Sequence, residues 1–405
     1  MRTVDEHLAT VLAGIRELPP IEQRLLDAHG CTLCEDVVAN LDLPAFDNAA
    51  MDGYAVHRAD VIGARPNRPV VLPVVGDVPA EEGPVQVLPA GLAMRIMTGA
   101  PIPSGADTVI PVEWTDGGIA KVAIQREPGP NTFIRRRGED VRAGEPIAWA
   151  GTRLDARKVA VLAALGREAV VVRPRPRVVV LSTGSELREP GQPLSEGTIY
   201  DANSFALAAA VREAGGIPYR VGVVPDDEQR FLRVLEEQLV RADLVITSGG
   251  VSVGAYDTVK LALQHLGTVE FTKVAMQPGM PQGFGVIGDD ETPIFTLPGN
   301  PVSAFVSFHV FVLPALRKMM GVTPYVRPTV RATTTAGWRS SVGRRQYARM
   351  AYTVAPDGSA LVRPVSGAGS HLVTGLGRAN ALAIVPEDVG EVPAGATLEV
   401  MLLDP

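Results

Sequence analysis

Apolar positions along the chain change their spacing several times, and each change predicts a different kind of element. Residues 1–40 have apolar residues at helical spacing, and the pair Pro19–Pro20 divides this stretch into two amphipathic helices. A further helix is expected over Asp155–Leu165, followed by a strand over Ala169–Val172. Residues 41–141 are rich in Pro, Gly and Val in short runs, which is typical of strands and turns.

The clearest pattern lies between residues 176 and 323, where continuous apolar runs alternate with helical stretches. Such alternation favours a mostly parallel sheet with helices on both faces, and ligands bind such sheets beyond the carboxyl ends of the strands. Strands are expected over Arg177–Leu181, Tyr219–Val224, Leu244–Thr247 and Pro293–Leu297, and helices near Ser204–Ala214, Asp227–Arg241, Ala255–Leu266 and Val302–Met320. The Met and Phe residues of 305–320 are expected to be core packing.

A chain of 405 residues is too long for one ordinary core, and these patterns predict an α/β multidomain protein. A discontinuous helical linker domain would comprise residues 1–40 and 142–175, with residues 41–141 as an inserted β-rich domain. Residues 176–323 would form the α/β domain. Pro324 and Pro328 would mark the start of a C-terminal β domain, residues 324–405.

Charge and cysteine content narrow the classes of function. Lys and Arg total 38 against 45 for Asp and Glu, a net charge of -7, which argues against nucleic-acid and membrane binding. The first residues lack the layout of a signal peptide, so we expect a cytoplasmic protein. Cys31 and Cys34 form a lone C-x-x-C near His29; without a second pair, free thiols are expected in place of a zinc site.

Three expected strands end in polar, glycine-containing loops: Ser182–Glu186, Ser248–Gly254 and Pro298–Ser303. Glycine lets the backbone approach a ligand closely and point successive N–H groups at one spot. Asn300 could cap the next helix with Pro301 at its first position, leaving N–H groups for an anion. Any one loop could be an ordinary turn, but three at one sheet edge indicate a site for a phosphorylated ligand.

The acidic residues near these loops allow structural and chemical roles. Asp226 and Gln229 have the spacing of a capping box, which would leave Asp227 as the freer carboxylate. Asp257 follows the second loop and could either cap its helix or hold Mg²⁺, a hard cation that prefers oxygen ligands.

Two motifs in the inserted region have no helical or strand period. The first is PAFDNAAMDGYAV, residues 44–56, and the second is RRRGEDV, residues 135–141. The second could be a solvated charged turn, or its arginines could bind the oxygens of phosphate or another oxyanion in bidentate fashion.

Together the motifs resemble the molybdopterin molybdenumtransferase family, which includes bacterial MoeA and the E domain of gephyrin. Six pieces occur in family order between residues 44 and 305: PAFDNAAMDGYAV (44–56), RIMTGAPIPSGADTV (95–109), RRRGEDV (135–141), LSTGSEL (181–187), ITSGGVSVGAYDTVK (246–260) and LPGNPVSAF (297–305).

The resemblance implies a four-domain homodimer with a molybdopterin-binding α/β domain and a C-terminal β-barrel-like domain. Its active cleft would lie between that α/β domain and the inserted domain of the other subunit. Adenylylated molybdopterin and molybdate would react with the help of Mg²⁺, giving molybdenum cofactor and AMP. Partners would include the upstream adenylyltransferase and acceptor molybdoenzymes.

Site residues carry over only where a motif matches. The resemblance implies catalytic carboxylates at Asp52, Asp140, Glu186, Asp227 and Asp257, with Asp227 and Asp257 as Mg²⁺ ligands. It implies molybdopterin or nucleotide contacts at Thr98, Arg137, Ser182, Gly184, Gly249, Gly250, Ser252 and Asn300. Molybdate would contact Ser303, Gln277 and Arg344.

The chain departs from the family at two lysines, whose places are taken by Gln277 and Met280, and at an Asp, whose place is taken by Ser185. We expect either weaker molybdate binding or a substitute cation from Arg344, Arg345 or Arg349, with Ser366 and Ser370 at the same edge. Two rival functions are an adenylyltransferase with the same α/β fold, which the inserted domain disfavours, and an inactive molybdopterin-binding scaffold.

Overall fold

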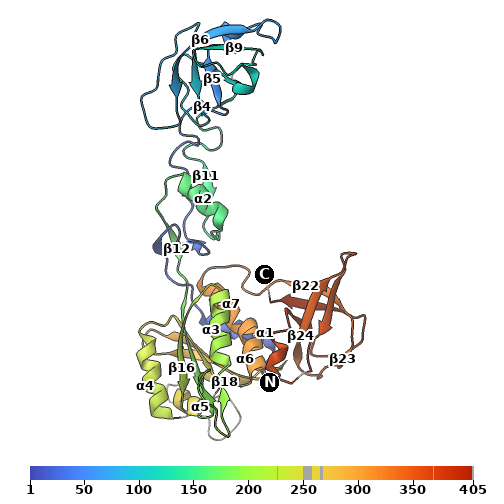
Figure 1. Ribbon diagram of the computed structural model, residues 1–405. Coiled ribbons are helices and arrows are strands. Elements are labelled where there is room, and N and C mark those ends of the chain that lie inside the picture. The colour runs from blue at the N-terminus through green and yellow to red at the C-terminus, as the bar shows by residue number, and fades with distance from the viewer. Residues whose placement is uncertain (131, 226, 250–257, 265–267, 368, 404–405) are drawn as a thin grey trace. The chain divides into compact units, whose positions relative to one another are not determined.

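The computed structural model describes residues 1–130, 132–225, 227–249, 258–264, 268–367 and 369–403 (Figure 1). The chain forms two compact units. One consists of residues 24–26 and 35–170, and the other of residues 1–23, 27–34 and 171–405.

A six-stranded sheet forms the centre of the second unit, in the order β16–β13–β17–β21–β20–β18. The first four strands are parallel, and β20 and β18 add an antiparallel edge. All four strands expected from the sequence are confirmed, so the predicted mostly parallel sheet is confirmed too. The strands are β13 (Arg177–Thr183), β16 (Ile217–Val224), β17 (Leu244–Ser248), β18 (Glu270–Lys273), β20 (Pro281–Ile287) and β21 (Thr292–Leu297).

Helices cover both faces of this sheet (Figure 1). On β13, Val178 and Val180 point into one core, while Val179 and Leu181 point into the other, as the two-residue period of a strand requires. The first core is closed by α1 (Val4–Gly14), α3 (Asn203–Glu213), α6 (Pro301–Ser307) and α7 (Leu313–Met319), and the second by α4 (Glu228–Leu239) and α5 (Thr258–Gln264).

The helical stretch Pro301–Met319 is long and apolar enough to cross a membrane by length and composition, but 83% of it is buried inside the protein. It consists of α6, a π-helical turn over Phe308–Val312 (η3) and α7. Phe308, Phe311, Met319 and Met320 lie in the core, as predicted for residues 305–320, whereas Phe305 is half-buried.

The C-terminal strands close into a five-stranded barrel in the order β24–β25–β22–β28–β26, because β24 pairs with both β25 and β26. This confirms the β-barrel-like domain expected at the end of the chain. Strand β19 (Met276–Gln277) pairs in parallel with β24 and joins the barrel to the α/β part. The barrel strands are β22 (Thr329–Thr334), β24 (Arg345–Val354), β25 (Ala360–Pro364), β26 (Ala381–Val385) and β28 (Thr397–Leu402).

The first unit is rich in short strands, as expected, and contains one α-helix in its described part, α2 (Ala156–Ala164), capped by Asp155, besides two short 3-10 helices. Its main sheet has the order β8–β5–β7–β6–β9. These strands are β5 (Gly53–Val56), β6 (Val70–Val78), β7 (Ala93–Ile96), β8 (Thr108–Pro111) and β9 (Lys121–Ile124).

Of the two helices predicted within residues 1–40, the prediction of the second is wrong. The first, α1, is present and begins with a capping box between Thr3 and Glu6. Residues 21–40 instead form β1 (Ile21–Arg24), β2 (Thr32–Leu33) and β3 (Val37–Val38). Strands β1 and β2 flank β12 (Ala169–Arg173), so sheet hydrogen bonds from a distant segment override the local helical pattern.

Two buried histidines make the α/β part sensitive to acid. Burial lowers the pKa of His309 to about 3 and that of His7 to about 4. Neither ring nitrogen of His309 has a hydrogen-bond partner within the described ranges, and its ring packs against Phe305. Both side chains are therefore neutral in the folded protein near pH 7, whereas the unfolded chain takes up protons below pH about 6.5.

We predict that folding stability falls as the pH drops from 6.5 towards 4, by about 2 kcal/mol per histidine between pH 6.5 and 5. Urea denaturation at pH 7 and pH 5 measures this loss. His309→Met should shrink the difference between the two pH values, while substitution of the exposed His371 by Gln should leave it unchanged. An equal difference in His309→Met and the unsubstituted protein would contradict the assignment.

Candidate functional site

The carboxyl ends of three parallel strands lie in register at one edge of the α/β sheet. Ser182 of β13 pairs with Ser248 of β17, and Ser248 pairs with Leu297 of β21. The three loops singled out in the sequence therefore begin side by side, which is the place where parallel sheets bind ligands.

Glycines allow the loops to pack against one another. Gly249 has φ +93°, and its N–H donates to the Leu297 carbonyl at 3.1 Å. A Cβ at this position would lie 2.6 Å from the Thr183 carbonyl oxygen, so no side chain fits. Gly299 of the third loop lies close by, because a Cβ built on it would be 3.6 Å from the Gly249 Cα.

The residues predicted to bind the ligand at this edge are found in different settings. Ser182 is buried, and Gly184 follows it with φ +156°, while the Glu186 carboxylate of the same loop is exposed. Asn300 is the N-cap residue of α6 with Pro301 at the first position, as predicted, but its side chain makes no capping hydrogen bond. Ser303 is buried in α6.

The sequence analysis placed the cap of α4 one residue too early. The N-cap is Asp227, whose carboxylate accepts a hydrogen bond from the Arg230 N–H at 2.7 Å. The expectation that Asp227 is the freer carboxylate is therefore wrong, because one of its oxygens caps the helix. Asp226, Gly250, Ser252 and Asp257 lie outside the described residues.

The described residues contain no group of three or more His, Cys, Asp or Glu that could hold a metal ion. Asp227 and Glu186 offer exposed carboxylate oxygens, which is the ligand chemistry that Mg²⁺ prefers. Mg²⁺ commonly uses only one or two carboxylates together with substrate phosphates, so the donor set fits an ion that arrives with a phosphorylated substrate. Cys31 and Cys34 form no disulfide in the part of the chain that the structure describes.

Sequence analysis missed two residues at the start of α3 that join the loops together. Asp201 is 1% exposed and accepts hydrogen bonds from the Ser182 hydroxyl at 2.9 Å and from Ser204. The Asn203 amide donates to the Ser248 hydroxyl and to the Gly299 carbonyl, each at 2.7 Å. The segment Tyr200–Asn203 carries no glycine or charge cluster, so the sequence offers no signal for this role.

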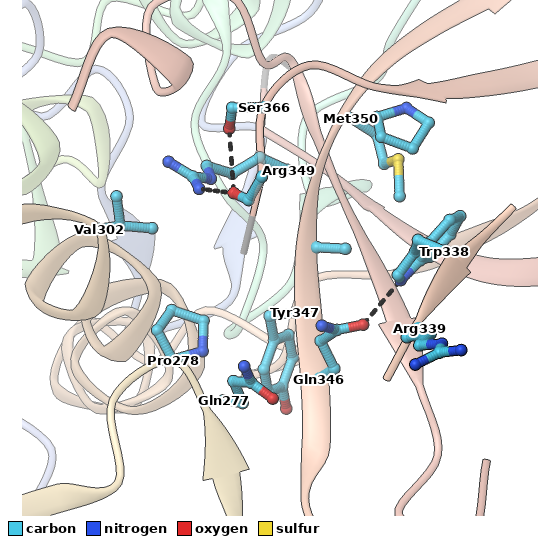
Figure 2. Close-up of a pocket in the computed structure, with 13 residues that line it drawn as sticks. Gln277, Pro278, Val302, Trp338, Arg339, Gln346, Tyr347, Arg349, Met350 and Ser366 are labelled. Carbon is cyan, nitrogen blue, oxygen red and sulfur yellow. Dashed lines mark hydrogen bonds between the residues drawn. The ribbon is translucent and has the colours of Figure 1, made fainter. Parts of the chain in front are cut away.

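A cavity of about 160 Å³ lies between the α/β part and the barrel, within the second unit (Figure 2). Its walls include Gln277 and Val302 from the α/β part and Tyr347, Arg349 and Ser366 from the barrel. Figure 2 shows Arg349 next to Ser366, and the cavity also reaches Trp338, whose indole N–H donates to Gln346 at 2.8 Å.

Arg349 brings a buried positive charge to this cavity. It is 5% exposed, and its guanidinium donates to the carbonyls of Leu372, Gly367 and Gly369. In the part of the chain that the structure describes it forms no ion pair with a carboxylate, and burial lowers its pKa. A buried cation without a counter-ion is costly, so this position favours a bound anion.

The other two arginines considered from the sequence have different surroundings. Arg345 pairs with Asp5 at 2.7 Å and with Glu387 at 3.0 Å, and the hydrogen bond that it donates to Asp5 raises its pKa. Arg344 is half-buried and does not line the cavity. Of the three, Arg349 is the one that faces the cavity holding Gln277.

In the first unit, the predicted carboxylate Asp52 is held by Thr98. Its Oδ1 accepts hydrogen bonds from the Thr98 N–H at 2.6 Å and hydroxyl at 2.8 Å, and these bonds lower the pKa of Asp52. Asp140 is exposed. Arg137 pairs with Asp42, so at least one arginine of the RRRGEDV motif has a partner inside its own unit.

Three family models match the chain in order. The MoeA N-terminal region (domain I and II) covers residues 2–166, a probable molybdopterin binding domain covers residues 179–318, and the MoeA C-terminal region (domain IV) covers residues 331–403.

Curated and solved relatives match over nearly the whole chain. Molybdopterin molybdenumtransferase 2 of Mycobacterium tuberculosis is 48% identical and covers 99% of both chains. The molybdopterin molybdenumtransferase of Haemophilus influenzae is 36% identical over 99% of this chain and 98% of its own. The crystal structure of a molybdopterin biosynthesis MoeA protein from Pyrococcus horikoshii has a TM-score of 0.79 and 32% identity, covering 100% of this chain and 99% of its own.

The geometry at Gly249 gives a test of how tightly the loops are packed. Gly249→Ala should lower the free energy of unfolding by about 1–3 kcal/mol more than Gly191→Ala, because overpacking adds to the cost of a left-handed backbone. Gly191 is a matched control, since its φ is +92° and nothing lies within 4 Å of its Cβ position. Equal losses in urea denaturation would show that the contact with Thr183 is not tight.

Proposed function

Since the chain belongs to the molybdopterin molybdenumtransferase family, we propose that it transfers molybdenum from molybdate to adenylylated molybdopterin, releasing molybdenum cofactor and AMP. The observation that carries this proposal is the 48% identity over 99% of both chains to a relative of that name. Family matches to the N-terminal, central and C-terminal regions argue against an adenylyltransferase, which would resemble the α/β domain alone.

We assign the pterin and nucleotide part of the substrate to the carboxyl edge of the α/β sheet. Ser182, Gly184 and Gly249 lie on loops that start side by side there, and glycine at the latter two positions lets the backbone of these loops approach a ligand closely. Gly250, Ser252 and Asn300 would complete this set by resemblance to the family. Holding the phosphates and the dithiolene in a fixed orientation is the main contribution expected of the protein.

Mg²⁺ would supply positive charge to the pyrophosphate of the substrate. Asp227, together with Asp257, is the proposed ligand pair, and Glu186 would orient water or a phosphate oxygen beside it. The second oxygen of Asp227 is available for this, because its helix-capping hydrogen bond uses Oδ1. A divalent ion held by so few protein groups would bind weakly without substrate.

Molybdate would occupy the cavity beside Arg349. A tetrahedral dianion there supplies the counter-charge that the buried guanidinium lacks, and the Gln277 amide and Ser366 hydroxyl can donate further hydrogen bonds. Ser303 follows Val302, which lines the cavity. The family lysines replaced by Gln277 and Met280 would each add a positive charge, so this chain relies on the arginines that line the cavity, the buried Arg349 and the exposed Arg339.

The homodimer, the cytoplasmic location, and contacts with the upstream adenylyltransferase and acceptor molybdoenzymes stay predictions from the resemblance. Of these, only the contact with acceptor molybdoenzymes also follows from the proposed reaction, because its product must pass to an enzyme that uses it.

The reaction is tested by mixing the protein with adenylylated molybdopterin, Mg²⁺ and molybdate, and following AMP release and reconstitution of a cofactor-free molybdoenzyme. Molybdate-dependent AMP release with reconstitution is the expected result. Asp52→Asn should lower turnover by on the order of 100-fold or more while leaving thermal stability nearly unchanged.

Asp116→Asn is the matched control, because Asp116 is also a carboxylate of the first unit that accepts hydrogen bonds from backbone N–H groups. It should turn over like the unsubstituted protein. If substrate binds and neither product appears, the chain is a molybdopterin-binding scaffold and the proposed function is wrong.

The charge of the cavity gives a separate prediction for molybdate. Gln277→Lys should tighten molybdate binding by about tenfold, or about 1.4 kcal/mol, and make binding more sensitive to salt. Arg349→Gln should weaken binding by at least as much, whereas Arg344→Gln should have little effect. Calorimetric titration with molybdate measures all three, and a larger loss in Arg344→Gln than in Arg349→Gln would move the site away from the cavity.

A further inference from the structure

Asn203 forms hydrogen bonds with residues beside both proposed subsites, the one for the nucleotide and the one for molybdate. It lies in the first turn of α3, and its side-chain nitrogen donates two hydrogen bonds of 2.7 Å. One reaches the Ser248 hydroxyl, directly before Gly249 in the loop after β17, which we call the nucleotide loop. The other reaches the carbonyl of Gly299, in the turn that leads into α6.

The turn held by Asn203 continues into the wall of the cavity beside Arg349, where molybdate is proposed to bind. Val302 lies three residues after Gly299 and lines the cavity, and its N–H donates to the Ser370 carbonyl at 3.1 Å. This bond joins α6 to the loop that carries the carbonyls of Gly367 and Gly369, which hold the Arg349 guanidinium. An unbroken set of hydrogen bonds and short chain segments therefore leads from Asn203 to Arg349.

A second buried polar side chain, Asp201, makes hydrogen bonds to the neighbouring loop. Asp201 is 1% exposed and holds the Ser182 hydroxyl at the end of β13, with Arg220 at 3.9 Å and Ser204 as its other partners. Asp201 bonds to Ser182 at the end of β13, whereas Ser248 at the end of β17 and Gly299 after β21 are bonded by Asn203. Loss of its two bonds would free both loops relative to α3 without disturbing the buried carboxylate.

We propose that Asn203 is a positioning residue that fixes the nucleotide loop and the molybdate cavity relative to each other, an inference that rests on the proposed function. It touches neither substrate. It holds Ser248 and Gly299 so that the backbone around Gly249 and the wall formed by Val302 keep their places together. Binding at one subsite then favours binding at the other, since each ligand orders the turn that both share.

Variants of Asn203 separate its two hydrogen bonds. Asn203→Asp can still accept a hydrogen bond from the Ser248 hydroxyl, but its carboxylate cannot donate to the Gly299 carbonyl and repels it. Ser248→Ala removes the other bond, together with the 3.5 Å bond from the Ser248 hydroxyl to the Pro298 carbonyl, and leaves the one to Gly299. We expect Asn203→Asp to weaken molybdate binding about fivefold or more, and Ser248→Ala to weaken it less while raising KM for adenylylated molybdopterin.

A structural role alone would give a different pattern, and Asn380 provides the control. Its side chain also makes two backbone hydrogen bonds, to the N–H and the carbonyl of Tyr352, within the barrel. Asn380→Ala and Asn203→Ala should lose comparable thermal stability, but only Asn203→Ala should raise both KM values more than it lowers kcat. Molybdate affinity in Asn203→Asp equal to that of the unsubstituted protein, measured by calorimetry, would overturn the proposal.

The test does not depend on turnover. Molybdate alone is titrated into each variant, so the affinity comparison stands even if the unsubstituted protein releases no AMP. Absence of turnover in the unsubstituted protein would refute the proposed function, whereas equal molybdate affinities would refute the role of Asn203.

Discussion

The register of the parallel strands is the constraint on which the rest of the α/β part depends. Ser182, Ser248 and Leu297 lie side by side because β13, β17 and β21 run in the same direction and pair without offset at their ends. Cores on both faces hold that register, since Val178 and Val179 belong to opposite clusters and a one-residue slip would exchange them. The three polar loops that follow these strands therefore begin at one edge of the sheet.

That edge could be predicted from the sequence because its signals are local. Apolar runs predicted the strands β13, β16, β17 and β21, and the Gly and Ser residues after three of them predicted the loops. The antiparallel strand β20 (Pro281–Ile287) was not predicted, because Gly283 and Gly285 break its apolar pattern. Both are required there, since a Cβ at Gly283 would lie 1.9 Å from the Thr296 hydroxyl.

The errors and omissions arise where distant segments decide the outcome. Residues 21–24 have a helical pattern but form a strand beside β12, which is about 150 residues away in the chain. Asp201 and Asn203 act through partners up to 96 residues away, and no spacing rule links an Asn to a Gly at that separation. Hydroxyl and amide networks of this kind become visible only when the fold is known.

The cavity shows how a change of charge can be accommodated without a new motif. By resemblance to the family, Gln277 and Met280 replace two lysines; the arginines that line the cavity are Arg349 and Arg339, while Arg345 is paired with Asp5 and Glu387. Arg339 is exposed, whereas Arg349 is buried and three carbonyls orient its guanidinium, so its position is fixed before any anion arrives. A buried, preorganised cation presents its charge in one defined direction, and salt screens it less than an exposed one. Geometry at this cavity thus takes over part of what charge provides elsewhere in the family.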